Sequence, residues 1–279
     1  ANVSFKDGDA VNAFAAMMLE VEKMKRFGFT DGEVERAKAK IMSHYERAVE
    51  AAPTRKNADF VRPLLNAFYH NESYMDPETE LQVAQMICSQ LNAAVLSQIA
   101  ASMITDENMV VLYNGPEKEG LVNPTEEQLA TVIAAVKTAE IEANVEEAVN
   151  EPLISKTLKG SKVKKAAEGI YGSTEWTLKN GLKVVVLPTE YKKDQVIMNL
   201  KFDGGKTLVS DEEIVSLEDN IWSVYLNNTG VSKFPSTTLS KMLAGKNVNV
   251  YPNLGGTTHG IYGQSTPKDL ETAFQLMYL

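Results

Sequence analysis

The chain has 279 residues, of which 44% are hydrophobic and 23% charged, close to the average of globular proteins, so collagen-like, disordered and disulfide-scaffold classes are excluded. The 28 basic and 37 acidic residues give a formal net charge of −9. Because this charge has the wrong sign for binding phosphate backbones, we expect no nucleic-acid partner.

Cysteine content and apolar runs limit the fold further. Cys88 is the single cysteine, so no intrachain disulfide can form and packing must hold the fold together. The longest apolar stretches fall far short of the roughly 20 residues that a membrane helix needs, and no signal-peptide pattern is visible. We therefore expect no membrane insertion, and the residues themselves leave the compartment open.

The first part of the chain is predicted to be mostly helical. Apolar residues recur at helical spacing, which predicts helices over 9–27, 30–52, 57–69, 76–87, 93–101 and 124–136. Local signals mark several ends: Gly28 stops the first helix, while Thr30 and Thr125 each stand three residues before a Glu or Gln, the spacing of a capping box. The β-rich run 109–113 is predicted to be a strand.

A stretch with little apolar periodicity separates this part from the rest. Residues 140–151 are rich in acidic side chains and 156–165 in basic ones, which is typical of an interdomain linker. We therefore predict two mixed α+β domains, over 1–139 and 173–279, joined by a linker over 140–172. Because chains of this size usually divide their core, two domains agree with the length.

Beyond the linker the hydrophobic period becomes alternating. Residues 176–187 are predicted to form a β-hairpin, with Asn180-Gly181 supplying both positive-φ positions of a type I′ turn. Further strands are predicted over 195–202, 248–251 and 260–263, and helices over 211–226, 239–243 and from 266 onward. This alternation indicates an α+β class with antiparallel sheet.

No constellation of residues in the sequence points to catalysis. The candidate zinc ligands lie far apart, and neither H-E-x-x-H nor H-x-x-E-H occurs: His44, His70, Cys88 and His259. No G-x-S-x-G nucleophile elbow is present. The glycine pairs 204–205 and 255–256 fit bulges or turns better than phosphate loops. We predict no catalytic, metal-binding or cofactor-binding residue in the chain.

Other notable residues have ordinary explanations. Met17, Met18, Met24 and Met42 fit core-filling positions on helices. The lysines at 162, 164 and 165 fit a solvated linker, and the glutamate pairs 146–147 and 212–213 fit solvated faces.

Three stretches together resemble the pitrilysin and insulin-degrading family of inverted-motif zinc peptidases. Residues 28–38 (GFTDGEVERAK) are similar to the family's G-x-T-x-x-E-L-x-x-A-K helix entry, and 178–184 (LKNGLKV) to the L-x-N-G-L-x-V hairpin that opens each half. Residues 243–246 (LAGK) with 265–271 (STPKDLE) resemble the closing part of the non-catalytic half. The order and spacing of these stretches cover nearly the whole chain.

The resemblance implies an architecture of four related α+β domains in two halves that close around a peptide, with zinc in the first domain. Residues 1–139 would be the latter part of the second domain, 140–172 the linker between halves, and 173–279 most of the third domain, truncated at its C-terminus. The implied partners are a peptide substrate, through the chamber of the parent protein, and the upstream and downstream domains. Zinc would belong to the upstream catalytic domain, with no cofactor in this segment.

One departure from the family pattern bears on catalysis. On the helix where an active domain places H-x-x-E-H, the aligned positions here are Val215, Glu218 and Asp219. Only the glutamate matches, so the third domain would be a degenerate copy that supplies chamber wall.

The expected function is therefore a non-catalytic segment of a zinc metalloendopeptidase that helps to enclose peptides. One alternative is a degenerate structural or assembly subunit of the same family, and a weaker one is an unrelated peptide-binding protein. The apolar end 274–279 indicates a piece of a longer chain and an exposed surface that favours self-association. By resemblance to large bacterial members, the envelope or periplasm is the suspected compartment.

Overall fold

The computed structural model describes residues 1–105, 107–146, 149, 151–214 and 229–279. They form two compact units, each made of two stretches of chain. The first unit comprises Ala1–Lys38 and Met86–Ala148, and the second comprises Ala39–Gln85 and Val149–Leu279. None of the described helices has the length and apolar character needed to cross a membrane.

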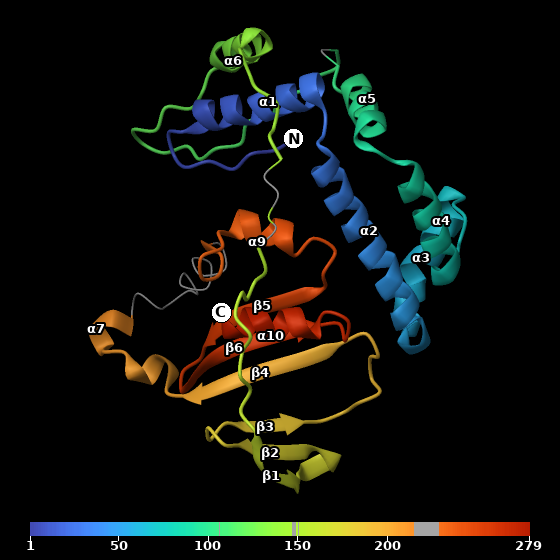
Figure 1. The fold of residues 1–279 in the computed structure, drawn as a ribbon. Coiled ribbons are helices and arrows are strands. Elements are labelled where there is room, and N and C mark those ends of the chain that lie inside the picture. Colours follow the sequence, from blue (N-terminus) through green and yellow to red (C-terminus); the bar gives the residue numbers. More distant parts are fainter. Residues whose placement is uncertain (106, 147–148, 150, 215–228) are drawn as a thin grey trace. The chain divides into compact units, whose positions relative to one another are not determined.

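The first unit is built around helix α1 (Ala10–Phe27), which packs against α5 (Ala93–Met103) and α6 (Glu126–Thr138) (Figure 1). Phe14 is buried on α1. Arg26, in the last turn of α1, donates hydrogen bonds to the final carbonyls of α6 and to the carbonyl of Ala139, groups that a helix leaves without internal partners. These contacts fix the C-terminal end of α6 to α1.

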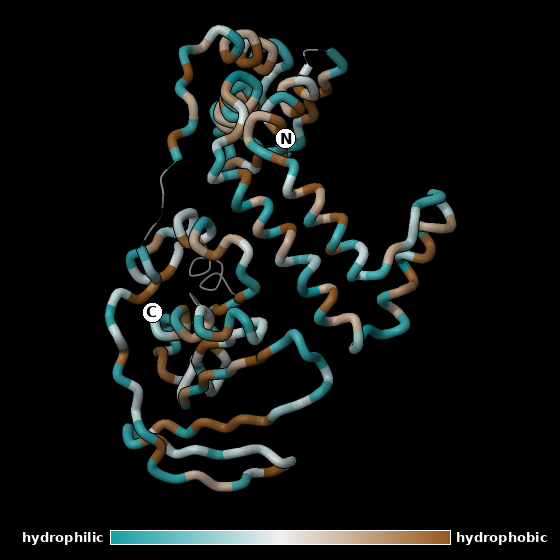
Figure 2. Tube along the Cα trace, turned by 45° about the vertical axis from the view of Figure 1, so that its right-hand side comes forward, coloured by the Kyte–Doolittle hydropathy of each residue, from teal (hydrophilic) through white to brown (hydrophobic). Residues whose placement is uncertain are grey.

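The helix starts predicted from the two capping boxes are confirmed, whereas the helices predicted from 239 and from 266 begin at Ser236 and Leu270. Helix α2 (Asp31–Ala51) begins at the predicted capping box, where Thr30 N donates to Glu33 Oε2 over 2.8 Å and Glu33 N donates to Thr30 Oγ1 over 3.2 Å. The box at the start of α6 pairs Thr125 with Gln128 in the same way. In Figure 2, α2 alternates teal and brown along its length, as an amphipathic helix does.

The predicted strand over 109–113 is wrong. This segment runs without regular secondary structure and pairs with no strand in the described part of the chain. Val110 is 78% exposed and Leu112 is 90% exposed. A β-rich sequence forms a strand only when a neighbouring strand takes up its backbone hydrogen bonds, and the described residues provide no such strand.

The second unit contains α3 (Asn57–His70), α4 (Pro77–Gln90) up to residue 85, α9 (Ser236–Met242) and α10 (Leu270–Tyr278). Helix α4 starts at Pro77, as predicted, after Asp76. The Asp76 carboxylate accepts hydrogen bonds from the backbone and hydroxyl of Thr79, which lower the pKa of Asp76. The described residues of this unit also form the short 3₁₀ turns η1 (Ala52–Thr54), η2 (Ile170–Gly172) and η3 (Gly205–Leu208).

Two antiparallel sheets give the second unit its β structure. The first has the order β1 (Val163–Glu168), β2 (Thr174–Leu178), β3 (Lys183–Val186). The second has the order β4 (Val196–Asp203), β6 (Thr258–Ser265), β5 (Val248–Leu254). Helix α10 lies against β5 and β6 (Figure 1), and its Ala273 is fully buried. The predicted α+β class with antiparallel sheet is confirmed.

The predicted hairpin of β2 and β3 is confirmed, but the predicted turn type is wrong. Gly181 has a φ of 91°, while Asn180 is not among the residues with positive φ. Leu178 N donates to Leu182 O over 2.8 Å, and Gly181 N donates to Leu178 O over 3.0 Å. The loop therefore has three residues, with glycine in the left-handed position, instead of a two-residue type I′ turn.

Two further predictions differ from the structure or fall outside it. Strand β1 lies inside the predicted linker and pairs with β2, although all its residues are exposed. The predicted helix over 211–226 is described only as α7 (Asp211–Ile214), and its remainder lies outside the described residues. At the C-terminal end, Phe274, Tyr278 and Leu279 are exposed, as predicted, whereas Met277, which was also predicted to be exposed, is half-buried.

The division into domains 1–139 and 173–279 concerns independent folding, so it stays a prediction. We expect limited trypsin digestion to cut first before β1, at the exposed Lys156 or Lys159, because this stretch has few core residues to offset the cost of ordering it. Mass spectrometry should then find two fragments that meet at these sites and that later cuts within the linker trim toward 1–140 and 173–279. First cuts within α1 or within 211–226, with 140–162 intact, would contradict the boundary.

Candidate functional site

The structure places the sequence's candidate zinc ligands on separate elements. His44 is on α2, His70 ends α3, Cys88 is buried on α4, and His259 is on β6. His259 has a structural contact, since its Nδ1 accepts a hydrogen bond from Gly205 N over 3.4 Å. Within the described ranges, no group of three or more His, Cys, Asp or Glu residues could hold a metal ion. The aligned Val215, Glu218 and Asp219 lie outside the described residues.

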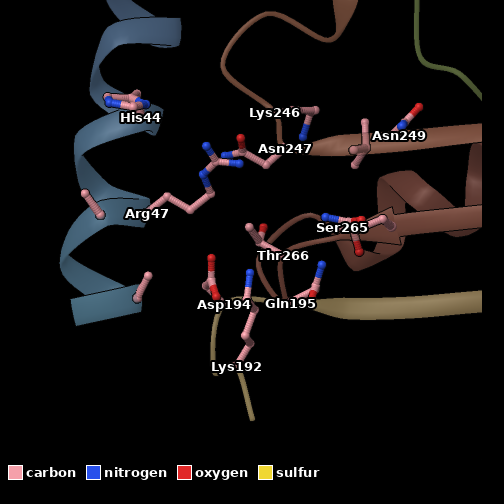
Figure 3. Close-up of a pocket in the computed structure, with 14 residues that line it drawn as sticks. His44, Arg47, Lys192, Asp194, Gln195, Lys246, Asn247, Asn249, Ser265 and Thr266 are labelled. Atoms are coloured by element: carbon pink, nitrogen blue, oxygen red, sulfur yellow. The ribbon is translucent and has the colours of Figure 1, made fainter. Parts of the chain in front are cut away.

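A polar pocket of about 470 Å³ lies among the described residues of the second unit. We call it the basic pocket, and its characteristic lining residues are Arg47, Lys192, Asp194, Lys246, Asn247 and Ser265. Figure 3 shows Arg47 extending from α2 toward Asn247 and Thr266, while Lys192 and Asp194 approach from the segment before β4. The side chains therefore converge on one space from different elements.

Helix α2 forms one wall of the basic pocket because of its periodicity. Residues 44, 47, 48 and 51 line the pocket, and their spacing of three and four places them on one helix face. The neighbouring Ser43 accepts a hydrogen bond from Asn247 Nδ2, and Glu46 accepts one from Lys268 Nζ over 3.0 Å. The bond to Glu46 raises the pKa of Lys268. These contacts hold the wall against the ends of the strands.

A buried carboxylate holds the opposite wall. Asp269 Oδ2 accepts hydrogen bonds from Asn247 N over 2.8 Å and from Thr266 Oγ1 over 3.1 Å. Thr266 N also donates to Asn247 O over 3.2 Å. The segments that enter β5 and leave β6 are thus fixed side by side at the edge of the pocket. Lys246 Nζ lies 3.8 Å from Asp269 Oδ1, a long ion pair.

The basic pocket has more positive than negative groups. Arg47 and Lys192 make no hydrogen bond or ion pair with the described residues, and among the described lining residues Asp194 is the only carboxylate. Two polar atoms in the walls, Asp194 Oδ1 and Ser265 Oγ, are buried without a hydrogen-bond partner in the described structure. The unpaired cations suit an anionic ligand, the Asp194 oxygen can only accept and suits an N–H or O–H group of a ligand, and the Ser265 hydroxyl can pair with either.

Sequence reasoning missed this pocket. Its cations lie at positions 47, 192 and 246, far apart in the sequence, so no motif connects them. The sequence showed only that Arg47 lies on a predicted helix. A single arginine on a helix is equally typical of a solvated face. Folding brings the three side chains to one place.

The first unit has an apolar hollow of about 840 Å³. It is bordered by one face of α1, including Phe14, Met17 and Met18, and by the extended segment 109–113. The two methionines, which were predicted to fill the core, are half-buried beside this space. Its lining is too poor in ionisable groups to suggest a chemical step.

Comparison with known proteins adds a sequence relationship. No protein-family model matches the chain. The chain is 23% identical over 263 residues to an Arabidopsis thaliana protein described as "Zinc protease PQQL-like", with 92% of this chain and 24% of the relative covered. The chain thus spans about a quarter of the length of that relative. This match confirms the resemblance to a zinc peptidase that the sequence motifs indicate.

Two solved structures are similar to the chain at lower sequence identity. The periplasmic protease PqqL from Escherichia coli matches with a TM-score of 0.43 and 16% identity, over 95% of this chain and 29% of that chain. A mutant of the ferredoxin protease FusC, in complex with Arabidopsis ferredoxin, matches with a TM-score of 0.48 and 16% identity, over 97% of this chain and 30% of that chain.

Proposed function

We propose that this chain is a non-catalytic segment of a zinc metalloendopeptidase and that it helps to enclose peptide substrates for proteolysis. The observation that carries the proposal is the alignment of 92% of the chain with a part of a zinc protease. In this proposal, the catalytic zinc is held by another domain of the parent protein. The partners are the adjoining domains and the peptide in the chamber.

The non-catalytic role is supported by the chemistry of the available side chains. A catalytic zinc needs three protein ligands and an open position, and inverted-motif peptidases take two of the ligands from H-x-x-E-H. The three histidines of this sequence occur in no such motif. In the described structure, His259 Nδ1 is engaged with the backbone of Gly205, and His44 shares the pocket lining with one other possible ligand, Asp194, fewer than the three that a catalytic zinc needs. These residues do not fit a zinc site.

The alternatives differ in what they predict for peptides. A degenerate structural subunit would neither bind nor cleave them, whereas an unrelated peptide-binding protein would bind them without relation to a peptidase. An intact H-x-x-E-H in the sequence upstream of this segment in the parent protein favours the peptidase. Its absence favours the structural role.

The proposal is tested with the purified chain and labelled unstructured peptides. We expect fluorescence anisotropy to detect binding, mass spectrometry to find every peptide intact with or without added zinc, and metal analysis to find no stoichiometric zinc. Chelator-sensitive cleavage or about one tightly bound zinc per chain would show that the segment is catalytic. Absence of binding to all peptides would favour the structural subunit.

A further inference from the structure

The basic pocket has an electrostatic character opposite to that of the whole chain. Its lining includes three cations, Arg47, Lys192 and Lys246, against one carboxylate, Asp194, while the chain carries a formal charge of −9. Two of these cations have no ion-pair partner in the described structure, and Lys246 has only the distant Asp269. A local excess of positive charge in an acidic protein attracts anions to this place.

The uncharged part of the lining also favours a hydrogen-bonding ligand. Ser265 is 4% exposed, and its hydroxyl has no hydrogen-bond partner in the described part of the chain. Leaving a buried hydroxyl unpaired costs stability, so a ligand or water that reaches it is favoured. The side chains of Gln195, Asn249 and Gln264 provide further amide donors in the lining.

The charged side chains in the lining determine which kind of ligand the basic pocket can bind. Guanidinium and ammonium groups repel metal cations, and the guanidinium of Arg47 presents paired N–H donors that match the two oxygens of a carboxylate. The volume of about 470 Å³ is large enough for a side chain or a chain end. It is far too small for a folded domain. Pockets for small ligands occupy about 300 to 1,000 Å³.

We infer that the basic pocket binds a carboxylate carried by an unfolded peptide, with Arg47 as the principal contact and Lys192 and Lys246 as supporting charges. The inference rests on the proposed function, which supplies peptides as the ligand class. The carboxylate belongs either to an aspartate or glutamate side chain or to the peptide C-terminus. The segment thereby favours acidic peptides over neutral ones.

The test measures the binding of matched fluorescent peptides to the full 279-residue chain by anisotropy. One peptide contains aspartate and glutamate, a second has asparagine and glutamine in their places, and each is made with a free or an amidated C-terminus. We expect the acidic peptide to bind more tightly and to weaken as salt is added, since salt screens exposed charges. Amidation shows whether the chain end or the side chains supply the carboxylate.

Variants assign the effect to the pocket. Arg47→Gln should weaken binding of the acidic peptide by about tenfold, the loss expected for one charge-assisted hydrogen bond, and leave the neutral peptide unchanged. Arg47→Lys should restore part of the affinity. Arg62→Gln, an exposed arginine on α3 outside the pocket lining, is the matched control and should have no effect. Lys192→Gln should also reduce the affinity for the acidic peptide and so tests the pocket independently.

The outcomes separate the inference from the proposed function. If peptides bind but the acidic, neutral, free and amidated forms bind equally, or if Arg47→Gln and Arg62→Gln weaken binding alike, the inference is wrong and the proposed function stands. If no peptide binds, both are wrong. Circular dichroism melting of each variant confirms that the fold is retained, which we expect because Arg47 is exposed and makes no described hydrogen bond.

Discussion

Replacing Phe14 by alanine should destabilise the first unit by about 3 kcal/mol, at the lower end of the range for buried phenylalanines. Phe14 is 8% exposed on α1, so the substitution removes most of an aromatic ring from the interior. One side of the ring borders the apolar hollow, where packing partners are fewer, and this keeps the cost low in the range. Hydrogen exchange of the α1 amides measures the change for this unit alone.

Phe27→Ala is the matched control for Phe14. Phe27 lies on the same helix and loses the same atoms, but it is 45% exposed. Less apolar area returns to water on its removal, so we expect a loss below about 1 kcal/mol. Equal losses for the two variants would contradict the burial that the structure assigns to the inner face of α1.

Helix starts could be predicted from the sequence because their energetics are local. The capping boxes at Thr30 and Thr125 close hydrogen bonds between residues three apart, so the residue types at that spacing suffice. Gly28, with a φ of 70°, ends α1 for an equally local reason. The resemblance to zinc peptidases depends on such stretches too, since 28–38 includes one of the boxes.

Features that depend on distant parts of the chain could not be predicted in the same way. Strand β1 lacks hydrophobic alternation and is held by backbone pairing with β2, so its lysine-rich sequence favours a linker. The run 109–113 has strand-forming residues but no partner strand in the described structure. In both cases, whether the segment forms a strand depends on pairing with another strand. The residue types of the segment alone do not determine that pairing.

The contacts of charged side chains could not be predicted from the sequence either. Glu146 was predicted to be solvated, but it accepts hydrogen bonds from Arg36 over 2.6 Å and from Thr30 Oγ1 over 2.7 Å, beside the start of α2. The basic pocket is likewise assembled from cations on three separate segments. The sequence gives the number of such charges, and only the fold determines which of them meet.

The two glycine pairs are confirmed as turns, and they also pack against each other. Gly204 N donates to Thr257 O over 2.8 Å, and Lys206 N donates to Gly255 O over 2.9 Å. The second glycine of the first pair, Gly205, has a φ of 73° and is buried at the start of η3. The approach of these two backbones leaves no room for a side chain at Gly205.

Gly205→Ala should therefore destabilise the second unit by at least about 2 kcal/mol, because left-handed strain in a non-glycine residue alone costs of order 1 to 3 kcal/mol. An added Cβ would also lie 2.4 Å from Gly255 O and 2.7 Å from Thr258 N, both backbone atoms that cannot move aside without disturbing the connection to β6. Urea denaturation followed by circular dichroism, with hydrogen exchange in β5 and β6, measures the loss.

Gly256→Ala, in the adjoining turn, provides the control for Gly205→Ala. A Cβ at Gly256 would meet no heavy atom within 4 Å, and this residue is not among the glycines with positive φ. Its substitution should change the free energy of unfolding by no more than about 0.5 kcal/mol, as for surface sites without special contacts. A tolerated Gly205→Ala, or a loss at Gly256 as large as that at Gly205, would mean that the two turns do not approach each other as described.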